Sequence, residues 1–161
     1  MDIAIEFHSL SKTANMTGWR VGSAAGNPEL INALMRVKSN IDSGLSQAIQ
    51  EMGIEALSLS QEWLDSNNDI YKKRRDKVVS TLKEIGLDAL APKATLYIWT
   101  KVPEGYTSAS FTERLLEDVN VVVTPGNGYG SAGEGYIRLS LTIPDDQIDE
   151  GLRRLSQFTV S

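Results

Sequence analysis

The sequence predicts a mixed α/β (α+β) fold built of two structural parts. Apolar residues recur at helical spacing over a long stretch, residues 61–85, and short segments that alternate like β-strands lie on both sides of it. The 161 residues are 41% hydrophobic and 23% charged, which is typical of a globular protein with a sizeable core. We expect one part over residues 1–58. The second, over residues 59–161, should comprise the long linking helix and a smaller α+β domain.

The first part begins with two strands that flank a loop. In DIAIEF, the residues Ile3, Ile5 and Phe7 occupy alternate positions, so we expect their side chains to face inward from a strand. VGSAAG at 21–26 favours a second strand, because small residues let a neighbouring backbone or helix come close. The loop between them is held by sheet at both ends, which is a common setting for chemistry.

Helical signals dominate the middle of the chain. NPE at 27–29 supplies a capping side chain, a proline that needs no amide partner and an acid in the first turn, so a helix should run to about Lys38. LSQAIQEMGIEALS favours a helix over 43–58, and the apolar spacing favours the long helix at 61–85. Gly86 should end that helix, as glycine does after a last helical turn.

After residue 86 the pattern changes to short alternating elements. TLYIWTKV, VNVVVT and GYIRLSL have the composition of strands, and a helix is expected over roughly 108–118. A last helix has Asp145 and Asp146 in its first turn, and its apolar positions are Ile148, Leu152, Leu155 and Phe158. These elements predict a small α+β domain with an antiparallel or mixed sheet.

Charge and composition exclude several classes of partner. With a net charge of -5 and a pI near 4.9, the chain lacks the basic surface that binding to nucleic acid or an anionic membrane requires. Its basic cluster, residues 72–75, is interpreted as a solvated helix face. No apolar run approaches a membrane span, there is no cysteine, and the lone His8 has no partners for a metal site. We therefore expect a cytoplasmic protein with no metal.

The loop SLSKTANMTGWRVG, residues 9–22, gathers groups that suit a phosphate-bearing aldehyde. A lysine such as Lys12 reacts with a carbonyl as its neutral amine, which a desolvated pocket or a cationic neighbour favours. Arg20 offers a planar fork for a phosphate, and the hydroxyls of Ser9 and Ser11 can donate to the remaining oxygens. The open alternative is a surface lysine at position 12 and a structural ion pair at Arg20.

The spacing S-x-S-K-x-x-x-x-x-G-x-R-x-G resembles the pyridoxal-phosphate lysine motif of class I/II aminotransferases, the fold-type I family. The resemblance implies pyridoxal 5'-phosphate (PLP) as cofactor, with Lys12 as the catalytic Schiff-base lysine. It also implies that Ser9, Ser11 and Arg20 bind the cofactor phosphate. Residues 1–58 would then be the C-terminal part of the PLP-binding large domain, and 59–161 the linking helix and small domain.

A second segment, TPGNGYGSAGEGYIRLSLT, is similar to the family segment whose arginine receives the substrate α-carboxylate. That arginine would be Arg138, and a two-point contact would fix the substrate for reaction. The alternative for Arg138 is an ion pair on an edge strand. A nucleotide-phosphate loop is a poor interpretation of these glycines, because such a loop opens a helix and this one leads into a strand.

Over nearly its whole length the chain resembles LL-diaminopimelate aminotransferases and aspartate-type aminotransferases. The resemblance implies amino-group transfer between an amino acid and a 2-keto acid, by an enzyme that forms a homodimer. It also implies a C-terminal fragment that is itself inactive, since the family's phosphate loop, ring-stacking aromatic residue and pyridinium aspartate would precede residue 1. The rival interpretation is a non-catalytic, aminotransferase-like binding or assembly module.

Overall fold

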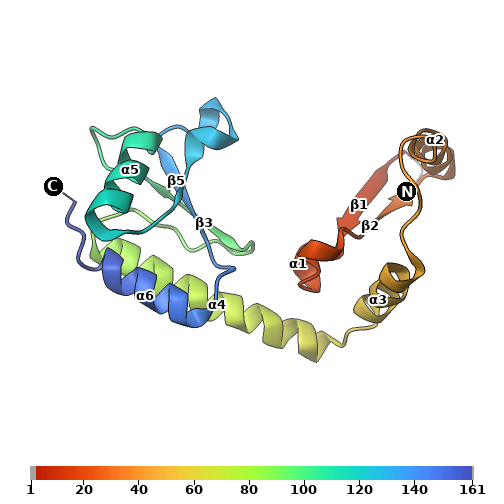
Figure 1. The fold of residues 1–161 in the computed structure, drawn as a ribbon, viewed down its shortest axis with the longest axis horizontal. Helices are drawn as coiled ribbons and strands as arrows, with labels where there is room; N and C mark the ends of the chain where they lie inside the picture. The colour runs from red at the N-terminus through yellow and green to blue at the C-terminus, as the bar shows by residue number, and fades with distance from the viewer. Residues whose placement is uncertain (1–2, 161) are drawn as a thin grey trace. The chain divides into compact units, whose positions relative to one another are not determined.

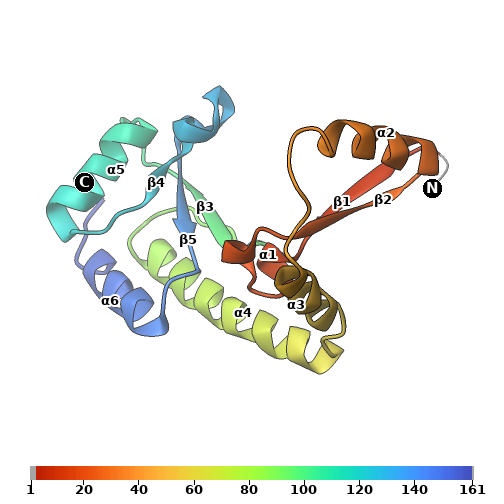
Figure 2. The same cartoon turned by 45° about the vertical axis from the view of Figure 1, so that its right-hand side comes forward.

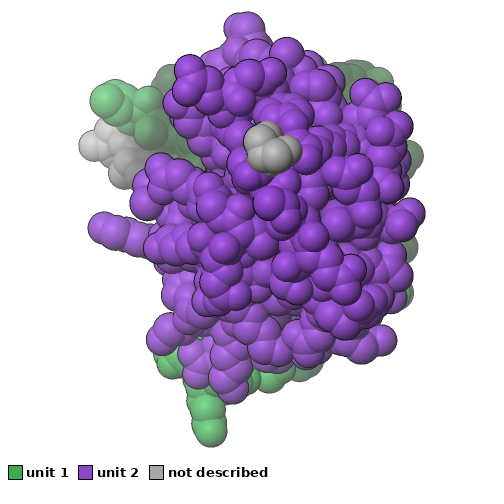
Figure 3. Space-filling view, turned by 90° about the vertical axis from the view of Figure 1, so that its left-hand side faces the viewer, with its two compact units in different colours: residues 1–66 green, residues 67–161 purple. Residues whose placement is uncertain are grey.

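The computed structural model describes residues 3–160 and divides the chain into two compact units, Met1–Ser66 and Asn67–Ser161 (Figure 3). The mixture of helices and short sheets that the sequence predicts is confirmed. The division between the units falls inside the long helix, whereas the predicted boundary lies just before it, at residues 58 and 59. No helix among the described residues is long and apolar enough to cross a membrane.

The first unit combines a two-stranded antiparallel sheet with helices (Figure 1). Its elements are β1 (Ile5–Ser9), α1 (Leu10–Thr13), the 3₁₀ turn η1 (Thr17–Trp19), β2 (Gly22–Gly26), α2 (Pro28–Lys38) and α3 (Gln47–Leu57). The predicted cap of α2 is confirmed, because the Asn27 side chain accepts hydrogen bonds from the backbone amides of Glu29 (2.8 Å) and Leu30 (3.2 Å). α3 begins at Gln47, four residues later than expected.

The apolar face predicted for the first strand is not buried in this unit. Ile5 is half-buried, but Ile3 is 93% exposed and Phe7 is 69% exposed, so the prediction that these two face inward is wrong for the described chain. Met16 is the one large hydrophobic side chain of this unit that is buried among the described residues. The alternation correctly indicates a strand, but no layer of the described residues covers that face.

The second unit is built around a three-stranded antiparallel sheet with strand order β3-β5-β4. Its elements are most of α4 (Gln61–Glu84), then β3 (Tyr97–Lys101), α5 (Ser108–Val119), β4 (Thr124–Pro125), the 3₁₀ turns η2 (Gly126–Tyr129) and η3 (Ser131–Gly133), β5 (Tyr136–Ser140) and α6 (Asp145–Leu155). α4 and α6 lie side by side in both ribbon views (Figures 1 and 2). The predicted end of the long helix is confirmed, since Gly86 has a φ of +87°.

The strand predicted over 119–124 is the main error in this unit. α5 continues through Val119, and Asn120 ends it in the left-handed conformation with a φ of 54°. Of the residues predicted as this strand, only Thr124 pairs with β5, and Pro125 after it completes the two-residue β4. The β-branched composition of VNVVVT therefore reflects burial against the core, where Val119 and Val123 are both less than 10% exposed, more than strand pairing.

The hydrophobic core lies on one face of this sheet, beneath α4, α5 and α6. Its side chains with no exposed surface include Leu82, Ile98, Phe111, Ile137 and Leu141. Ile98 and Ile137 come from β3 and β5 at positions that alternate with outward residues. The other face of the sheet is therefore free to carry polar and aromatic side chains.

The basic cluster at 72–75 is only partly a solvated face. Arg74 donates from Nε to Asp145 Oδ1 (2.7 Å) and from Nη1 to the Leu141 carbonyl (2.9 Å), and its side chain is 15% exposed. Arg75 donates from Nη1 to the Pro92 carbonyl at 3.0 Å. The interpretation of the whole cluster as solvated is wrong, because two of its four residues bind backbone carbonyls of the same unit.

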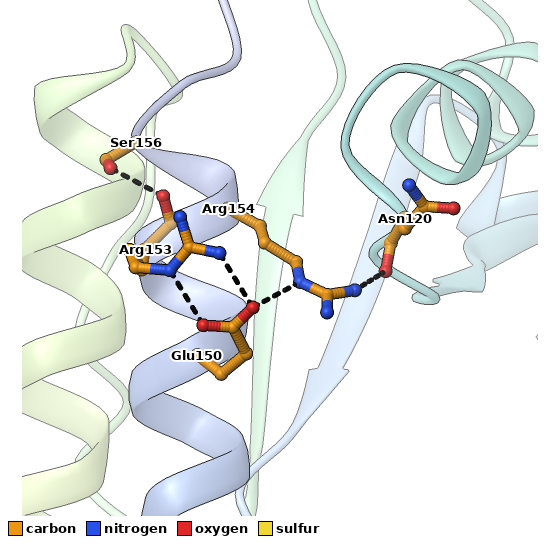
Figure 4. Close-up of polar contacts among 5 residues, drawn as sticks. All are labelled: Asn120, Glu150, Arg153, Arg154 and Ser156. Atoms are coloured by element: carbon orange, nitrogen blue, oxygen red, sulfur yellow. Dashed lines mark hydrogen bonds and ion pairs between the residues drawn. The ribbon is translucent and has the colours of Figure 1, made fainter.

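A cluster of charges on α6 makes stability depend on pH (Figure 4). Hydrogen bonds from Arg153, and then from Arg154, lower the pKa of Glu150 from 4.5 to about 2. Since the folded pKa lies below the unfolded one, the stabilisation is fully present above about pH 5 and is lost as the pH falls through 2. We expect Glu150→Gln to be less stable than the parent at pH 7, with most of this difference lost at pH 2, measured by urea unfolding.

The control for this prediction is Glu117→Gln on α5. The Glu117 carboxylate makes no ion pair among residues 3–160. A difference between Glu150→Gln and the parent that stays constant from pH 7 to pH 2 would contradict the assignment of this stability to the carboxylate.

Candidate active site

Lys12 lies on the loop that connects β1 to β2, and this loop starts and ends at the same end of the strand pair. Ser9 at the end of β1 pairs with Gly22 at the start of β2, and the Leu10 amide donates to the Val21 carbonyl at 3.4 Å. The 12 residues from 10 to 21 therefore form a closed loop, with Lys12 on the single turn of α1. The prediction of a loop held by sheet at both ends is confirmed.

The hydroxyl of Ser9 is bound to the turn that carries the lysine. Ser9 is the N-cap of α1, and its Oγ accepts a hydrogen bond from the Ser11 amide at 3.2 Å. An accepting hydroxyl still has its own proton to donate. Ser9 can thus both fix the lysine turn and donate to an anion.

Thr17 connects the two ends of the loop, and nothing in the sequence indicated this role. Its Oγ1 donates to the Ser11 carbonyl (2.9 Å), and its own carbonyl accepts from Arg20 Nη1 (3.2 Å). Arg20 has a φ of 54°, the left-handed conformation that costs energy for a residue with a side chain. The structure therefore brings Ser11 and Arg20 into one hydrogen-bonded arrangement.

The donors of this loop suit a phosphate and an aldehyde. Ser9, Lys12 and Arg20 are exposed, and Ser11 is half-buried. Within residues 3–160, Lys12 makes no side-chain hydrogen bond and Arg20 forms no ion pair, so a structural ion pair at Arg20 is not found. Two hydroxyls and a guanidinium can donate hydrogen bonds to a phosphate, and a lysine side chain can react with an aldehyde.

Arg138 lies in the second unit, on the central strand of its sheet. It pairs with Trp99 of β3 on one side and with Thr124 of β4 on the other. No ion pair of Arg138 occurs within the described part of the chain, so the alternative of an ion pair on an edge strand is wrong. Arg138 projects from the face opposite the core, because its neighbour Ile137 is buried.

Aromatic rings surround the Arg138 guanidinium. Its central carbon lies over the Tyr97 ring, 4.1 Å from the centroid, and over the Tyr129 ring, 4.3 Å from the centroid. Trp99 meets Tyr129 edge to face at 5.5 Å. Arg138 Nε is buried and finds no hydrogen-bond partner among the residues that the structure describes. Trp99 pairs with Arg138 across the sheet, so it lies on the same face as that arginine.

The glycine-rich segment before β5 positions Tyr129. A Cβ on Gly126 would lie 2.1 Å from the Gly133 carbonyl oxygen, so the two backbones approach more closely than any side chain permits. Ser108 at the start of α5 donates from its amide to Glu134 Oε1 (2.8 Å) and from Oγ to the Gly133 carbonyl (3.3 Å). The segment turns through η2 and η3 into β5, which confirms the prediction that it leads into a strand.

The Glu134 carboxylate is held in its charged form. Hydrogen bonds from the backbone amides of Ser108 and Gly135 keep the pKa of Glu134 below its usual value. This anchor fastens the glycine-rich segment to α5 at neutral pH. Of the two proposed functional residues, Lys12 belongs to the first unit and Arg138 to the second.

Known proteins share the sequence and fold of this chain. Residues 2–155 match the family "Aminotransferase class I and II". The chain is 60% identical over 160 residues to the LL-diaminopimelate aminotransferase of Dehalococcoides mccartyi (strain CBDB1), a match that covers 99% of this chain and 41% of that enzyme. It is 51% identical over 157 residues to the LL-diaminopimelate aminotransferase of Aquifex aeolicus (strain VF5), covering 98% of this chain and 41% of the relative.

A solved structure shows the same fold. The aromatic aminotransferase of Pyrococcus horikoshii OT3 superposes with a TM-score of 0.89 at 31% identity, over 97% of this chain and 42% of that one. The chain spans about 41% of the length of the curated relatives that it matches. The family resemblance expected from the lysine motif and the arginine segment is confirmed.

Proposed function

This chain belongs to the class I and II aminotransferases, and we propose that the enzyme containing it transfers an amino group from an amino acid to a 2-keto acid. The likeness to LL-diaminopimelate aminotransferases supports an amino donor of the diaminopimelate or aspartate type. The observation that carries the proposal is the closed loop that holds Ser9, Ser11, Lys12 and Arg20 between two paired strands.

PLP is the cofactor of this family, and when bound it accepts electrons from the substrate Cα. In our proposal Lys12 is the residue that would hold PLP through its amine. Arg20 and the hydroxyls of Ser9 and Ser11 donate hydrogen bonds to its phosphate. Arg20 Nη1 donates a hydrogen bond to the Thr17 carbonyl at 3.2 Å, and in our proposal this bond positions the guanidinium for the phosphate.

Two side chains of this chain act on the amino acid itself. The Lys12 Nζ would accept the proton from the substrate Cα as a general base, and the protonated amine would then serve as a general acid. Arg138 binds the α-carboxylate through its guanidinium. The same proposal assigns residues 1–58 to the PLP-binding large domain and 59–161 to the linking helix and small domain, in a cytoplasmic homodimer.

The test of this function uses the full-length enzyme loaded with PLP. Aspartate or LL-diaminopimelate is supplied with 2-oxoglutarate, and the formation of glutamate is followed. We expect glutamate with at least one donor and parallel lines in double-reciprocal plots, because the amino group moves in two separate stages. The 161-residue chain alone should form little or no glutamate. A full-length enzyme that retains PLP yet transfers no amino group from any amino acid would favour the binding-module alternative.

Replacing Arg20 by leucine should chiefly weaken retention of the cofactor. A charge-assisted hydrogen bond contributes about 1.5–3 kcal/mol, so the Kd for PLP of the full-length enzyme should rise by about 10- to 100-fold. The measurement is PLP absorbance after dialysis against a range of free PLP concentrations. The control is Arg36→Leu on α2, which lies outside the loop. A variant that keeps PLP normally but loses affinity for the amino acid would contradict the role of Arg20.

A further inference from the structure

We propose that Tyr97 and Tyr129 are positioning residues that hold the Arg138 guanidinium between them and present its Nη edge to a planar carboxylate. The inference rests on the proposed function of Arg138 and concerns what enables that arginine to bind a carboxylate. It starts from three observations on the outer face of the second unit's sheet. These are the two ring contacts at 4.1 and 4.3 Å, and the buried Nε, which has no hydrogen-bond partner within residues 3–160.

The rings take the place of the acidic partner that a half-buried arginine normally has. Arg138 forms no ion pair among the residues that the structure describes, and its Nε is withdrawn from water. A guanidinium is attracted to the face of an aromatic ring, and the attraction is stronger where water is excluded. Tyr97 and Tyr129 thus stabilise the cation without neutralising it. An acidic partner would compete with an incoming carboxylate, whereas the rings leave the positive charge available.

The same contacts restrict the direction from which a ligand can bind. All five N–H donors of a guanidinium lie in its plane, and Nε is buried here. The rings cover the guanidinium where they contact it, so the accessible donors are those of the two Nη atoms. A carboxylate can meet both Nη atoms with its two oxygens in one plane. The arrangement therefore selects a flat carboxylate approaching end-on.

The backbone explains why these particular rings meet Arg138. Tyr97 and Trp99 are two residues apart on β3, so they share the outer face, and Trp99 pairs with Arg138 across the sheet. Tyr129 arrives from η2, whose Gly126 lies close to the backbone of Gly133 in η3 and to the Tyr136 carbonyl in β5. Trp99 then supports Tyr129 edge to face at 5.5 Å.

The experiment measures the binding of maleate, a dicarboxylate that has no amino or keto group to exchange, to the full-length PLP enzyme. Tyr97→Leu and Tyr129→Leu should each raise the Kd for maleate about tenfold and raise the KM of the amino donor similarly. The kcat and the PLP absorbance should change less than about threefold. Tyr97→Phe and Tyr129→Phe should bind like the parent, because they keep the ring. The matched control is Tyr136→Leu, which removes a ring from the same face that contacts Trp99 and not Arg138.

A second series remains informative if a leucine variant fails to fold. Phenylalanine and pentafluorophenylalanine at position 129 have nearly the same shape, but fluorination reverses the charge distribution of the ring face. Tyr129 is 49% exposed, so both should fold. We expect the fluorinated variant to bind maleate at least fivefold more weakly. We call the Tyr97 and Tyr129 rings that hold Arg138 the clamp. Equal binding by the two variants would overturn it.

Arg138→Leu separates this inference from the function on which it rests. Leucine at 97 and 129 without effect, together with lost maleate binding in Arg138→Leu, would refute the clamp and leave the carboxylate role of Arg138 intact. Normal maleate binding by Arg138→Leu would refute both. Transfer of amino groups by the parent enzyme is assayed independently, so the failure of the clamp cannot be mistaken for the absence of aminotransferase activity.

Discussion

Replacing Lys12 by alanine is expected to lower turnover of the full-length enzyme by about 10⁴-fold or more, because one amine both binds the cofactor and moves the proton. Lys12 is an exposed side chain on the single turn of α1, with no hydrogen bond or ion pair to residues 3–160 that its removal would break. The stability of the protein should therefore change little. The loss of rate would then report on chemistry and not on unfolding.

The measurements are the rate of glutamate formation and the site of covalent attachment. Borohydride reduction of the PLP enzyme followed by peptide mapping should label Lys12 in the parent and leave the Lys12→Ala variant unlabelled at this loop. Lys12→Arg should be as inactive as Lys12→Ala, since a guanidinium keeps the charge but not the nucleophile. Lys38→Ala is the matched control, because Lys38 is exposed in the same unit and, among the described residues, forms an ion pair only with Asp42. Turnover of Lys12→Ala within tenfold of the parent would refute the assignment.

Replacing Arg138 by leucine is expected to lower kcat/KM by about 10²- to 10³-fold, mostly through KM. Two charge-assisted hydrogen bonds to the substrate carboxylate would be lost, at about 1.5–2 kcal/mol each. Leucine on the central strand remains compatible with the sheet, and the guanidinium makes no ion pair with the described residues that would be broken. We therefore expect a folded enzyme with normal PLP absorbance and weak substrate binding.

Steady-state kinetics of the full-length enzyme with varied amino donor test this prediction. Arg138→Lys should recover only part of the affinity, since an ammonium cannot make the planar two-point contact. Arg153→Leu is the control, because Arg153 is an arginine of the same unit whose side chain is 58% exposed and bound to Glu150. An Arg138→Leu enzyme that loses PLP while keeping its KM would exchange the roles assigned to Arg20 and Arg138.

The helices were predictable from the sequence because their signals are local. The Asn27 cap fixes the start of α2, and Gly86 fixes the end of α4, each through residues adjacent in the chain. The strands were predicted less well, because pairing depends on distant partners. VNVVVT has the composition of a strand, but the helix before it extends to Val119 and only Thr124 and Pro125 find β5.

In the candidate site, too, the residues of a local motif were predicted and those that depend on distant contacts were not. Ser9, Ser11, Lys12 and Arg20 form a motif with fixed spacing, so the sequence indicated the loop. Thr17 could not be singled out, because its bonds to Ser11 and Arg20 depend on how the loop folds back. The rings over Arg138 depend on the register of β3 against β5 and on the path of η2. These contacts join residues that are far apart in the sequence, so they cannot be predicted from the spacing of residues along the chain.

The close contact of Gly126 with Gly133 has a thermodynamic consequence for ligand binding. Together with the bonds from Ser108 to Glu134 and to Gly133, it fixes the segment that carries Tyr129 through contacts within the second unit. The conformational entropy of this segment is therefore lost when the unit folds and not when a carboxylate arrives. Binding of a carboxylate at Arg138 should then show a small entropic penalty, because the binding site is preorganised.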